Sequence, residues 1–317
     1  MTITTRPMEA IAEGGERTPS FRWALAALSL SMLLSSLGTS IANVGLPALA
    51  EAFGASFQAV QWVVLAYLLA ITTLIVSVGR LGDMVGRRRL LIAGIALFTF
   101  ASVLCGVAPT LWMLIAARAV QGLGAAMMMA LAMALVGETV PKARTGSAMG
   151  LLGTTSAIGT ALGPSLGGLL IAGLGWRAIF LAGVPLGVLA FFLACRSLPA
   201  DRERPKDRTG FDTTGTVLLA LTLAAYALAM TIGHGSFGPL NIGLLLAAIF
   251  TGALFLFTET RTAFPLLRLA MFRDPVLSSG LAMSALVSTV MMATLVVGPF
   301  YLSRAERIGR GERRAKL

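Results

Sequence analysis

Charged side chains are scarce in this sequence. Only 12% of its 317 residues are charged, against roughly 25% in an ordinary soluble domain. Hydrophobic residues make up 56%, and the mean hydropathy is +0.85. A water-soluble protein could not bury so much apolar surface, so a soluble enzyme or binding domain is excluded. The composition instead predicts an all-α polytopic membrane protein that lives in a lipid bilayer.

The chain also has little of the chemistry that enzymes use. It contains 14 acidic residues, one histidine and two cysteines, and every acidic residue falls in a predicted loop, tail or span end. His234 lies in a predicted glycine-containing loop, where it is expected to be solvated. The spans offer no paired carboxylates, metal-ligand cluster or nucleophile–base pair. We therefore predict no enzymatic activity, no catalytic residue, no metal site and no cofactor.

Two further scarcities restrict the interpretation. Cys105 and Cys195 fall near opposite membrane faces of the predicted topology. A disulfide needs Cα atoms within roughly 7 Å, so both are predicted to be buried free thiols. The first twenty residues lack an apolar run and are predicted to be a disordered tail rather than a cleavable signal peptide.

What the sequence does have is a series of apolar segments long enough to cross a bilayer, which takes about 20 residues each. The predicted spans are 23–46, 59–78, 90–108, 111–136, 146–174, 178–198, 213–232, 240–257 and 275–302. Most Lys and Arg residues lie in the loops on the side of the N-terminus. Short loops rich in Lys and Arg stay cytoplasmic, so we predict a plasma-membrane (inner-membrane) protein with a cytoplasmic N-terminus. This charge asymmetry accounts for the net charge of +11 without a nucleic-acid partner.

The loop between the second and third predicted spans carries an unusual pattern, Gly79-Arg-Leu-Gly-Asp-Met-Val-Gly-Arg-Arg-Arg89. The simplest interpretation is a basic inside loop whose glycines allow tight turns. The pattern also resembles the signature between the second and third spans of major facilitator superfamily transporters. The resemblance implies a cytoplasmic gate that closes against a second helix bundle. The gate residues it indicates are Gly79, Gly82, Asp83, Gly86, Arg87 and Arg88.

The fourth span holds the only charge predicted inside the membrane. Arg118, Gln121, Gly122 and Ala125 recur at helical spacing and share one face. An arginine inside a span costs about 2.5–3.5 kcal/mol on insertion scales and usually faces a bundle interior or a watery cavity. The alternative is a side chain that extends to the headgroups. Arg-x-x-Gln-Gly is similar to the family motif whose arginine lines the cavity and takes part in proton transfer, which makes Arg118 and Gln121 the candidate cavity residues.

The fifth span contains a stripe of glycines at every fourth position, which lets another helix approach closely. The proline after the second of them favours a kink. Gly-x-x-x-Gly-Pro-x-x-Gly-Gly resembles the motif of the antiporters in the superfamily, and later segments resemble its fourteen-span drug:proton branch. The resemblance implies a seam against the other bundle. The residues it indicates are Gly159, Gly163, Pro164, Gly167 and Gly168.

The sequence departs from this family in one respect that bears on mechanism. The family usually places an aspartate in the first span where Gly38 stands here, and no carboxylate falls in the middle of any span. A proton-coupled pump needs a group whose protonation can cycle, and Arg118 holds its proton too tightly. The missing carboxylate also argues against a strongly cationic substrate.

The resemblance extends from Phe21 to about Ser303 and organises the chain. The last fourteen residues change abruptly to a basic composition where the family has five further spans, which predicts a truncated or frameshifted chain. The expected parts are a disordered cytoplasmic tail (1–22), an N-terminal six-helix bundle of two three-helix units (23–198), a cytoplasmic linker (199–212), two central transmembrane helices (213–257), a cytoplasmic loop (258–274), the first helix of an incomplete C-terminal bundle (275–303) and a basic tail (304–317).

Together these features predict a multidrug-type transporter of the major facilitator superfamily. We expect proton-coupled efflux of lipophilic small molecules by alternating access, with no cofactor beyond the proton gradient. Two alternatives remain open, because alternating access moves two bundles around a central site. The short chain is either a transport-inactive remnant or a half-transporter that self-associates.

Overall fold

The computed structural model describes residues 21–201, 212–232, 238–262 and 274–290. The chain divides into two units, Met1–Leu266 and Leu267–Leu317, and each is described by itself. Within the described residues, eight helical segments are long and apolar enough to cross a membrane, and no strand occurs. The predicted all-α class is confirmed. The N-terminal tail, most of the linker, His234 and the basic C-terminal tail lie outside the described residues.

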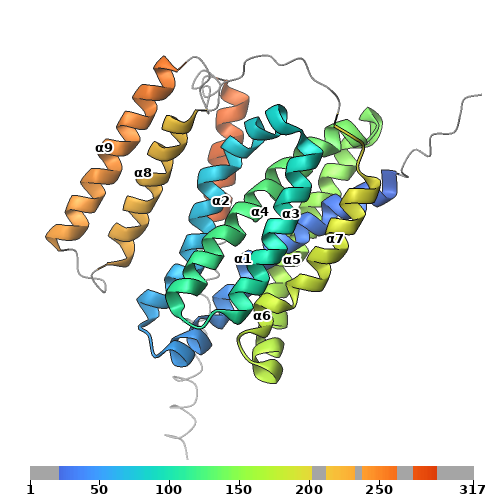
Figure 1. The fold of residues 1–317 in the computed structure, drawn as a ribbon. Helices are drawn as coiled ribbons and strands as arrows, with labels where there is room; N and C mark the ends of the chain where they lie inside the picture. Colours follow the sequence, from blue (N-terminus) through green and yellow to red (C-terminus); the bar gives the residue numbers. More distant parts are fainter. Residues whose placement is uncertain (1–20, 202–211, 233–237, 263–273, 291–317) are drawn as a thin grey trace, which may run out of the picture. The chain divides into compact units, whose positions relative to one another are not determined.

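The first unit consists of long helices joined by short connections (Figure 1). They are α1 (Phe21–Phe53), α2 (Phe57–Val85), α3 (Arg87–Val107), α4 (Leu111–Thr139), the short 3₁₀ helix η1 (Lys142–Arg144), α5 (Thr145–Leu174), α6 (Ala178–Leu181), α7 (Gly183–Ser197), α8 (Thr213–Thr231) and α9 (Pro239–Arg261). In the second unit one apolar helix is described, Pro275–Val290.

The six-helix bundle is built by reciprocal pairing of its helices. α1 packs along α5, and α2 packs along α4. α3 lies between α4 and α7, and α7 returns to α1. α1 and α2 thus each pair with a helix of the other predicted three-helix unit; the internal repeat itself stays a prediction. Buried apolar side chains from α1 to α5 and α7 form its main core.

The two following helices form a hairpin beside this bundle. α8 packs along α9 and also contacts α2 (Figure 1). Asp212 caps α8 by accepting a hydrogen bond from Gly215 N at 2.8 Å. The hydroxyls of Ser77 on α2 and Thr216 on α8 lie 2.8 Å apart in a buried hydrogen bond. The hairpin is therefore attached to the bundle by a specific polar contact as well as by apolar packing.

Three features of the predicted topology differ in the structure. The first span does not end at Pro47, because α1 continues to Phe53; a proline removes one backbone donor, and a long apolar helix tolerates that loss. The sixth span is interrupted between α6 and α7, just before Pro185, which has no N–H for the helical hydrogen bond.

The third correction concerns the charged segment 79–89. It is helical apart from Gly86, because α2 runs to Val85 and α3 begins at Arg87. Gly86 has φ +111°, a backbone conformation that residues with a Cβ rarely adopt. A single residue therefore reverses the chain, and the charged side chains are carried on the ends of two helices.

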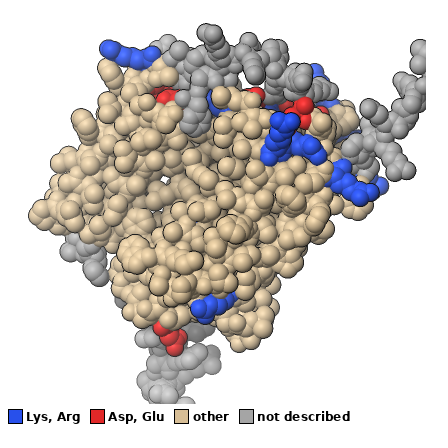
Figure 2. Space-filling model, in the orientation of Figure 1, with Lys and Arg blue, Asp and Glu red and all other residues tan. Residues whose placement is uncertain are grey.

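On the face seen in Figure 2, the exposed charged side chains lie at the two ends of the first unit. In the view of Figure 2, Lys, Arg, Asp and Glu gather at the upper and lower edges, and the surface between them is uncharged. Large apolar side chains such as Trp112, Leu169 and Phe250 are exposed on the helices, which suits contact with lipid acyl chains. Both cysteines are free as predicted; Cys105 is buried but Cys195 is only half-buried.

Candidate functional site

Arg118 is the centre of the candidate site. α4 begins after Thr110, whose hydroxyl accepts a hydrogen bond from Met113 N at 3.3 Å, and it carries Arg118 two turns into the bundle. The side chain is fully buried, with 0% of its surface exposed. The alternative in which it extends to the headgroups is therefore wrong, and the guanidinium lies in the bundle interior.

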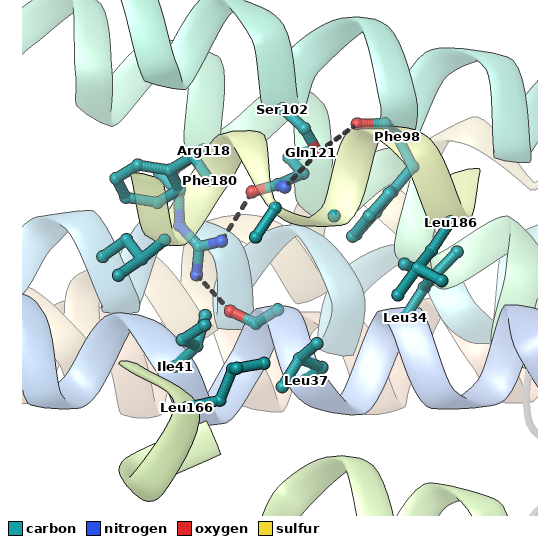
Figure 3. Close-up of a pocket in the computed structure, with 14 residues that line it drawn as sticks. Leu34, Leu37, Ile41, Phe98, Ser102, Arg118, Gln121, Leu166, Phe180 and Leu186 are labelled. Carbon is teal, nitrogen blue, oxygen red and sulfur yellow. Dashed lines mark hydrogen bonds between the residues drawn. The ribbon is translucent and has the colours of Figure 1, made fainter. Parts of the chain in front are cut away.

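Three neutral acceptors hold the guanidinium. Arg118 Nε donates to Val63 O on α2 at 2.9 Å, and Nη2 donates to Gly38 O on α1 at 3.1 Å. Nη1 donates to Gln121 Oε1, one turn further along α4, at 2.6 Å. Figure 3 shows the last two of these hydrogen bonds. The guanidinium thus joins α1, α2 and α4 at one point.

Gln121 extends this network to α3. Its Nε2 donates to Ser102 Oγ at 2.7 Å, and Ser102 Oγ donates to Phe98 O at 2.8 Å (Figure 3). The amide of Gln121 therefore accepts from the arginine with one end and donates to the serine with the other. The predicted pairing of Arg118 with Gln121 is present in the structure; their transport role stays a prediction.

Tyr67 is a partner that the sequence analysis missed. Its ring lies under the guanidinium, with Arg118 Cζ 4.0 Å from the ring centroid, in the geometry of a cation–π interaction. Its hydroxyl donates to Ser35 O at 2.8 Å, so the ring is fixed between α1 and α2. The sequence does contain one signal for this residue. A tyrosine in the middle of an apolar span has a buried hydroxyl, and that hydroxyl needs a hydrogen-bond partner.

The arginine lines a small cavity between α1, α3, α4, α5 and the α6–α7 junction. The cavity volume is about 40 Å³, and one water needs about 10–15 Å³. The space therefore takes about three waters, far below the roughly 300 Å³ of a drug-sized pocket. Its lining residues are Leu34, Leu37, Gly38, Ile41, Phe98, Ser102, Arg118, Gln121, Leu166, Ile179, Phe180, Ala182, Gly183 and Leu186 (Figure 3).

The candidate gate residues separate into two groups. Arg87 joins Asp83 at 2.8 Å and Glu138 on α4 at 3.1 Å. These side chains are 23% to 45% exposed, so solvent screens both ion pairs. Arg88 instead donates through Nη2 to Cys195 O on α7 at 2.6 Å. The segment is thus fixed to α4 on one side and to α7 on the other.

Asp201 is a second residue that the sequence analysis did not single out. Its carboxylate accepts hydrogen bonds from Arg88 N at 2.8 Å and from Arg89 N at 3.1 Å. It therefore caps the first turn of α3 from a distant point in the chain, where a negative charge also suits the helix dipole. A Cβ on Gly86 would clash with this carboxylate, so glycine is needed there for space as well as for its φ.

We predict that Asp201→Ala destabilises the start of α3. Loss of a side-chain cap costs about 0.5–2 kcal/mol, and amide hydrogen exchange at Arg88 and Arg89 should become faster. Arg89→Gln is the matched control, because the Arg89 side chain is 78% exposed and its Nε lies 4.0 Å from Asp201. Equal exchange in Asp201→Ala and the wild type would contradict the cap.

The glycine motif of the fifth span lies mostly inside this bundle. Gly159, Gly163 and Gly167 are buried, and their positions face the backbone and side chains of α1. Pro164 lies on the exposed side of α5, and a Cβ on Gly168 would meet open space. The three buried glycines thus form the contact between α1 and α5, and a seam against another bundle stays a prediction.

The chain is similar in sequence to a known family and to several of its members. A family model described as Major Facilitator Superfamily matches residues 28–315. The multidrug resistance protein Stp of Mycobacterium tuberculosis (strain CDC 1551 / Oshkosh) is 37% identical over 254 residues, which are 79% of this chain and 47% of that protein. The drug efflux pump JefA of the same strain is 35% identical over 291 residues, 88% of this chain and 56% of that protein.

Two further matches are transporters that are not named for drug resistance or drug efflux. The riboflavin transporter RibZ of Clostridioides difficile (strain 630) is 30% identical over 281 residues, 89% of this chain and 60% of that protein. A solved bacterial homologue of the human lysosomal transporter Spinster, inward-facing and occupied, matches with a TM-score of 0.53 at 19% identity, over 78% of this chain and 64% of that one. The latter likeness supports the fold alone.

These matches agree with the predicted functional class, a membrane transporter. The relatives are named as transporters and efflux proteins, not as enzymes. The chain spans about half the length of the first two curated relatives described above.

Proposed function

This chain belongs to the Major Facilitator Superfamily, and on this premise we propose that it exports lipophilic small molecules across the plasma membrane by alternating access. The proposed N-terminus is cytoplasmic, and the proposed driving force is a proton gradient. Curated relatives named for multidrug resistance and drug efflux support the direction of transport. The predicted roles of Arg118, of the segment 79–89 and of the α5 motif are parts of this proposal.

The buried cation at the cavity is the observation that carries the proposal. A charge in the bilayer interior is expensive, and where it occurs it usually faces a bundle interior or a cavity that a substrate or ion uses. Arg118 fits this description, because it is fully buried and lines a cavity whose other residues are uncharged. A purely structural role would be met as well by an apolar side chain at lower cost.

The proposal requires a second bundle around the cavity. Alternating access moves two bundles about a central site, and the cavity within this one admits only about three waters. A second copy of the chain is one source of that bundle, which makes a self-associating half-transporter the form of the proposal to test. A transport-inactive remnant is the competing outcome.

The experiment uses the purified 317-residue chain in proteoliposomes with an imposed pH gradient. The probes are naphthalene-1-sulfonate, a permanent anion, and (1-naphthylmethyl)trimethylammonium, a permanent cation. We expect gradient-driven accumulation of at least one probe above that in empty liposomes, abolished by an ionophore that collapses the gradient. Accumulation equal to that in empty liposomes for both would contradict the proposal. Cross-linking in the same vesicles reports whether active chains are paired.

A further inference from the structure

The charge of the cavity lining indicates the charge of the substrate that the proposed transporter carries. Resting on the proposed function, we infer that the transporter binds a lipophilic organic anion, with the anionic group in this small cavity on Arg118 and the rest of the molecule in the space that a second bundle would enclose. Among the fourteen residues that line the cavity, Arg118 alone is charged. The site within this bundle is therefore positive, and an anion is the ligand charge that it stabilises.

The guanidinium keeps donors available for such a ligand. An arginine has five N–H groups, and the hydrogen bonds to Val63, Gly38 and Gln121 use three of them. One N–H remains on each Nη atom. Two N–H groups of a guanidinium can bind the two oxygens of a carboxylate or sulfonate in parallel. The three bonded acceptors are neutral, so they orient the cation without cancelling its charge.

A helix terminus adds to the positive character of the site. α7 begins at Gly183, no side chain caps it at Ala182, and both residues line the cavity. The N-terminal end of a helix carries a partial positive charge. A negative group close to Arg118 would therefore face two positive features of the cavity, and a cationic group would be repelled by both.

The rest of the lining determines that the anion is lipophilic. Nine of its residues are leucine, isoleucine, phenylalanine or alanine. Phe98 and Phe180 lie at the cavity with their rings near the polar cluster (Figure 3). An aromatic or aliphatic body would bury apolar area against these side chains, while its charged oxygen atoms contact the guanidinium. Small hydrophilic anions would gain nothing from most of this wall.

Gly183 offers a direct test of the charge. An ideal Cβ there has one neighbour within 4 Å, Leu34 Cδ2 at 3.9 Å, so a Cβ can be added at this position without a clash. Gly183→Asp places a carboxylate on the cavity wall, and Gly183→Asn places a neutral side chain of the same size. Steric effects are common to both variants, so the difference between them reports the charge.

The experiment measures equilibrium binding of the two naphthalene probes to the full purified chain in detergent. We expect the wild type to bind naphthalene-1-sulfonate about tenfold or more tighter than (1-naphthylmethyl)trimethylammonium. The sulfonate affinity of Gly183→Asp should be about tenfold lower than that of Gly183→Asn. This is about the effect on affinity of losing one hydrogen bond to a charged group. Thermal unfolding of both variants establishes that they are folded.

The outcomes separate this inference from the proposed function. Preference for the anion, reduced in Gly183→Asp relative to Gly183→Asn, supports the inference. Saturable binding without charge preference, or with preference for the cation, overturns it and leaves the export proposal in place. Absence of saturable binding by either probe overturns the inference as well, and the proteoliposome measurement then decides the export proposal separately. Because wild-type selectivity alone can overturn the inference, it does not depend on either variant folding.

Discussion

Replacing Arg118 with methionine is expected to abolish export and anion binding while the chain keeps its fold. Methionine has a similar length and no charge, so the cavity wall stays filled. The lost hydrogen bonds between a ligand and a charged group are worth about 1.5–3 kcal/mol each. We therefore expect a loss of about tenfold to a hundredfold or more in probe affinity, measured on the same preparation as transport.

The fold should tolerate this change because the arginine is costly to bury. A buried charge costs about 2.5–3.5 kcal/mol on insertion scales, and replacement of buried ionic groups by apolar ones is often neutral or stabilising. Val63 O and Gly38 O lie inside helices, where each can still accept its backbone hydrogen bond, and the third acceptor, Gln121 Oε1, keeps Cys105 Sγ as a donor at 4.0 Å. We predict that the thermal unfolding temperature of Arg118→Met equals or exceeds that of the wild type.

Arg177→Met is the matched control for this prediction. Arg177 immediately precedes α6, with its guanidinium 4.4 Å from the centroid of a Trp176 ring, and it does not line the cavity. The same change in charge there should leave probe affinity unchanged. Retained export in Arg118→Met would remove Arg118 from the mechanism, and unfolding of Arg118→Met would show that the arginine is structural instead.

The sequence was sufficient for the fold class and for the centre of the site. Long apolar runs leave few alternatives to helices in a bilayer, since every backbone group must be hydrogen-bonded internally. A single charge within a span is also a strong signal, because its cost restricts where it can lie. Helical spacing predicts that Gln121 lies one turn from Arg118 on the same face, and their hydrogen bond is 2.6 Å long.

The contacts that complete the site could not be predicted in this way. Tyr67 is 51 positions from Arg118 along the chain and reaches it because α2 packs along α4. Asp201 caps α3 although more than a hundred residues separate them. The sequence pattern within one helix does not show which other helices will pack against it. The effect of a proline on a helix was also not predictable from sequence. Pro47 lies inside the continuous helix α1, whereas the chain breaks between α6 and α7 just before Pro185.

Gly163→Ala is expected to separate α1 from α5. A Cβ at this position would lie 2.7 Å from Ser40 Cβ and 2.9 Å from Ile41 N, closer than real contacts allow. Rotation of the Ser40 side chain cannot relieve an overlap with Cβ or with a backbone nitrogen, so the helices must move. The hydrogen bond from Ser40 Oγ to Thr160 O, 2.7 Å long, lies at the same contact and should weaken.

The expected cost of Gly163→Ala is about 1–3 kcal/mol, the usual penalty for overpacking a close contact, measured as a lower unfolding temperature in detergent. Gly153→Ala is the control, because it lies on the same helix outside the motif and its Cβ would meet no atom within 4 Å. Equal unfolding temperatures for the two variants would show that the motif does not hold α1 to α5. Leu166 of α5 lines the cavity with Leu37 and Ile41 of α1, so movement at this contact changes the cavity wall. Gly163→Ala should therefore also weaken probe binding, whereas Gly153→Ala should not.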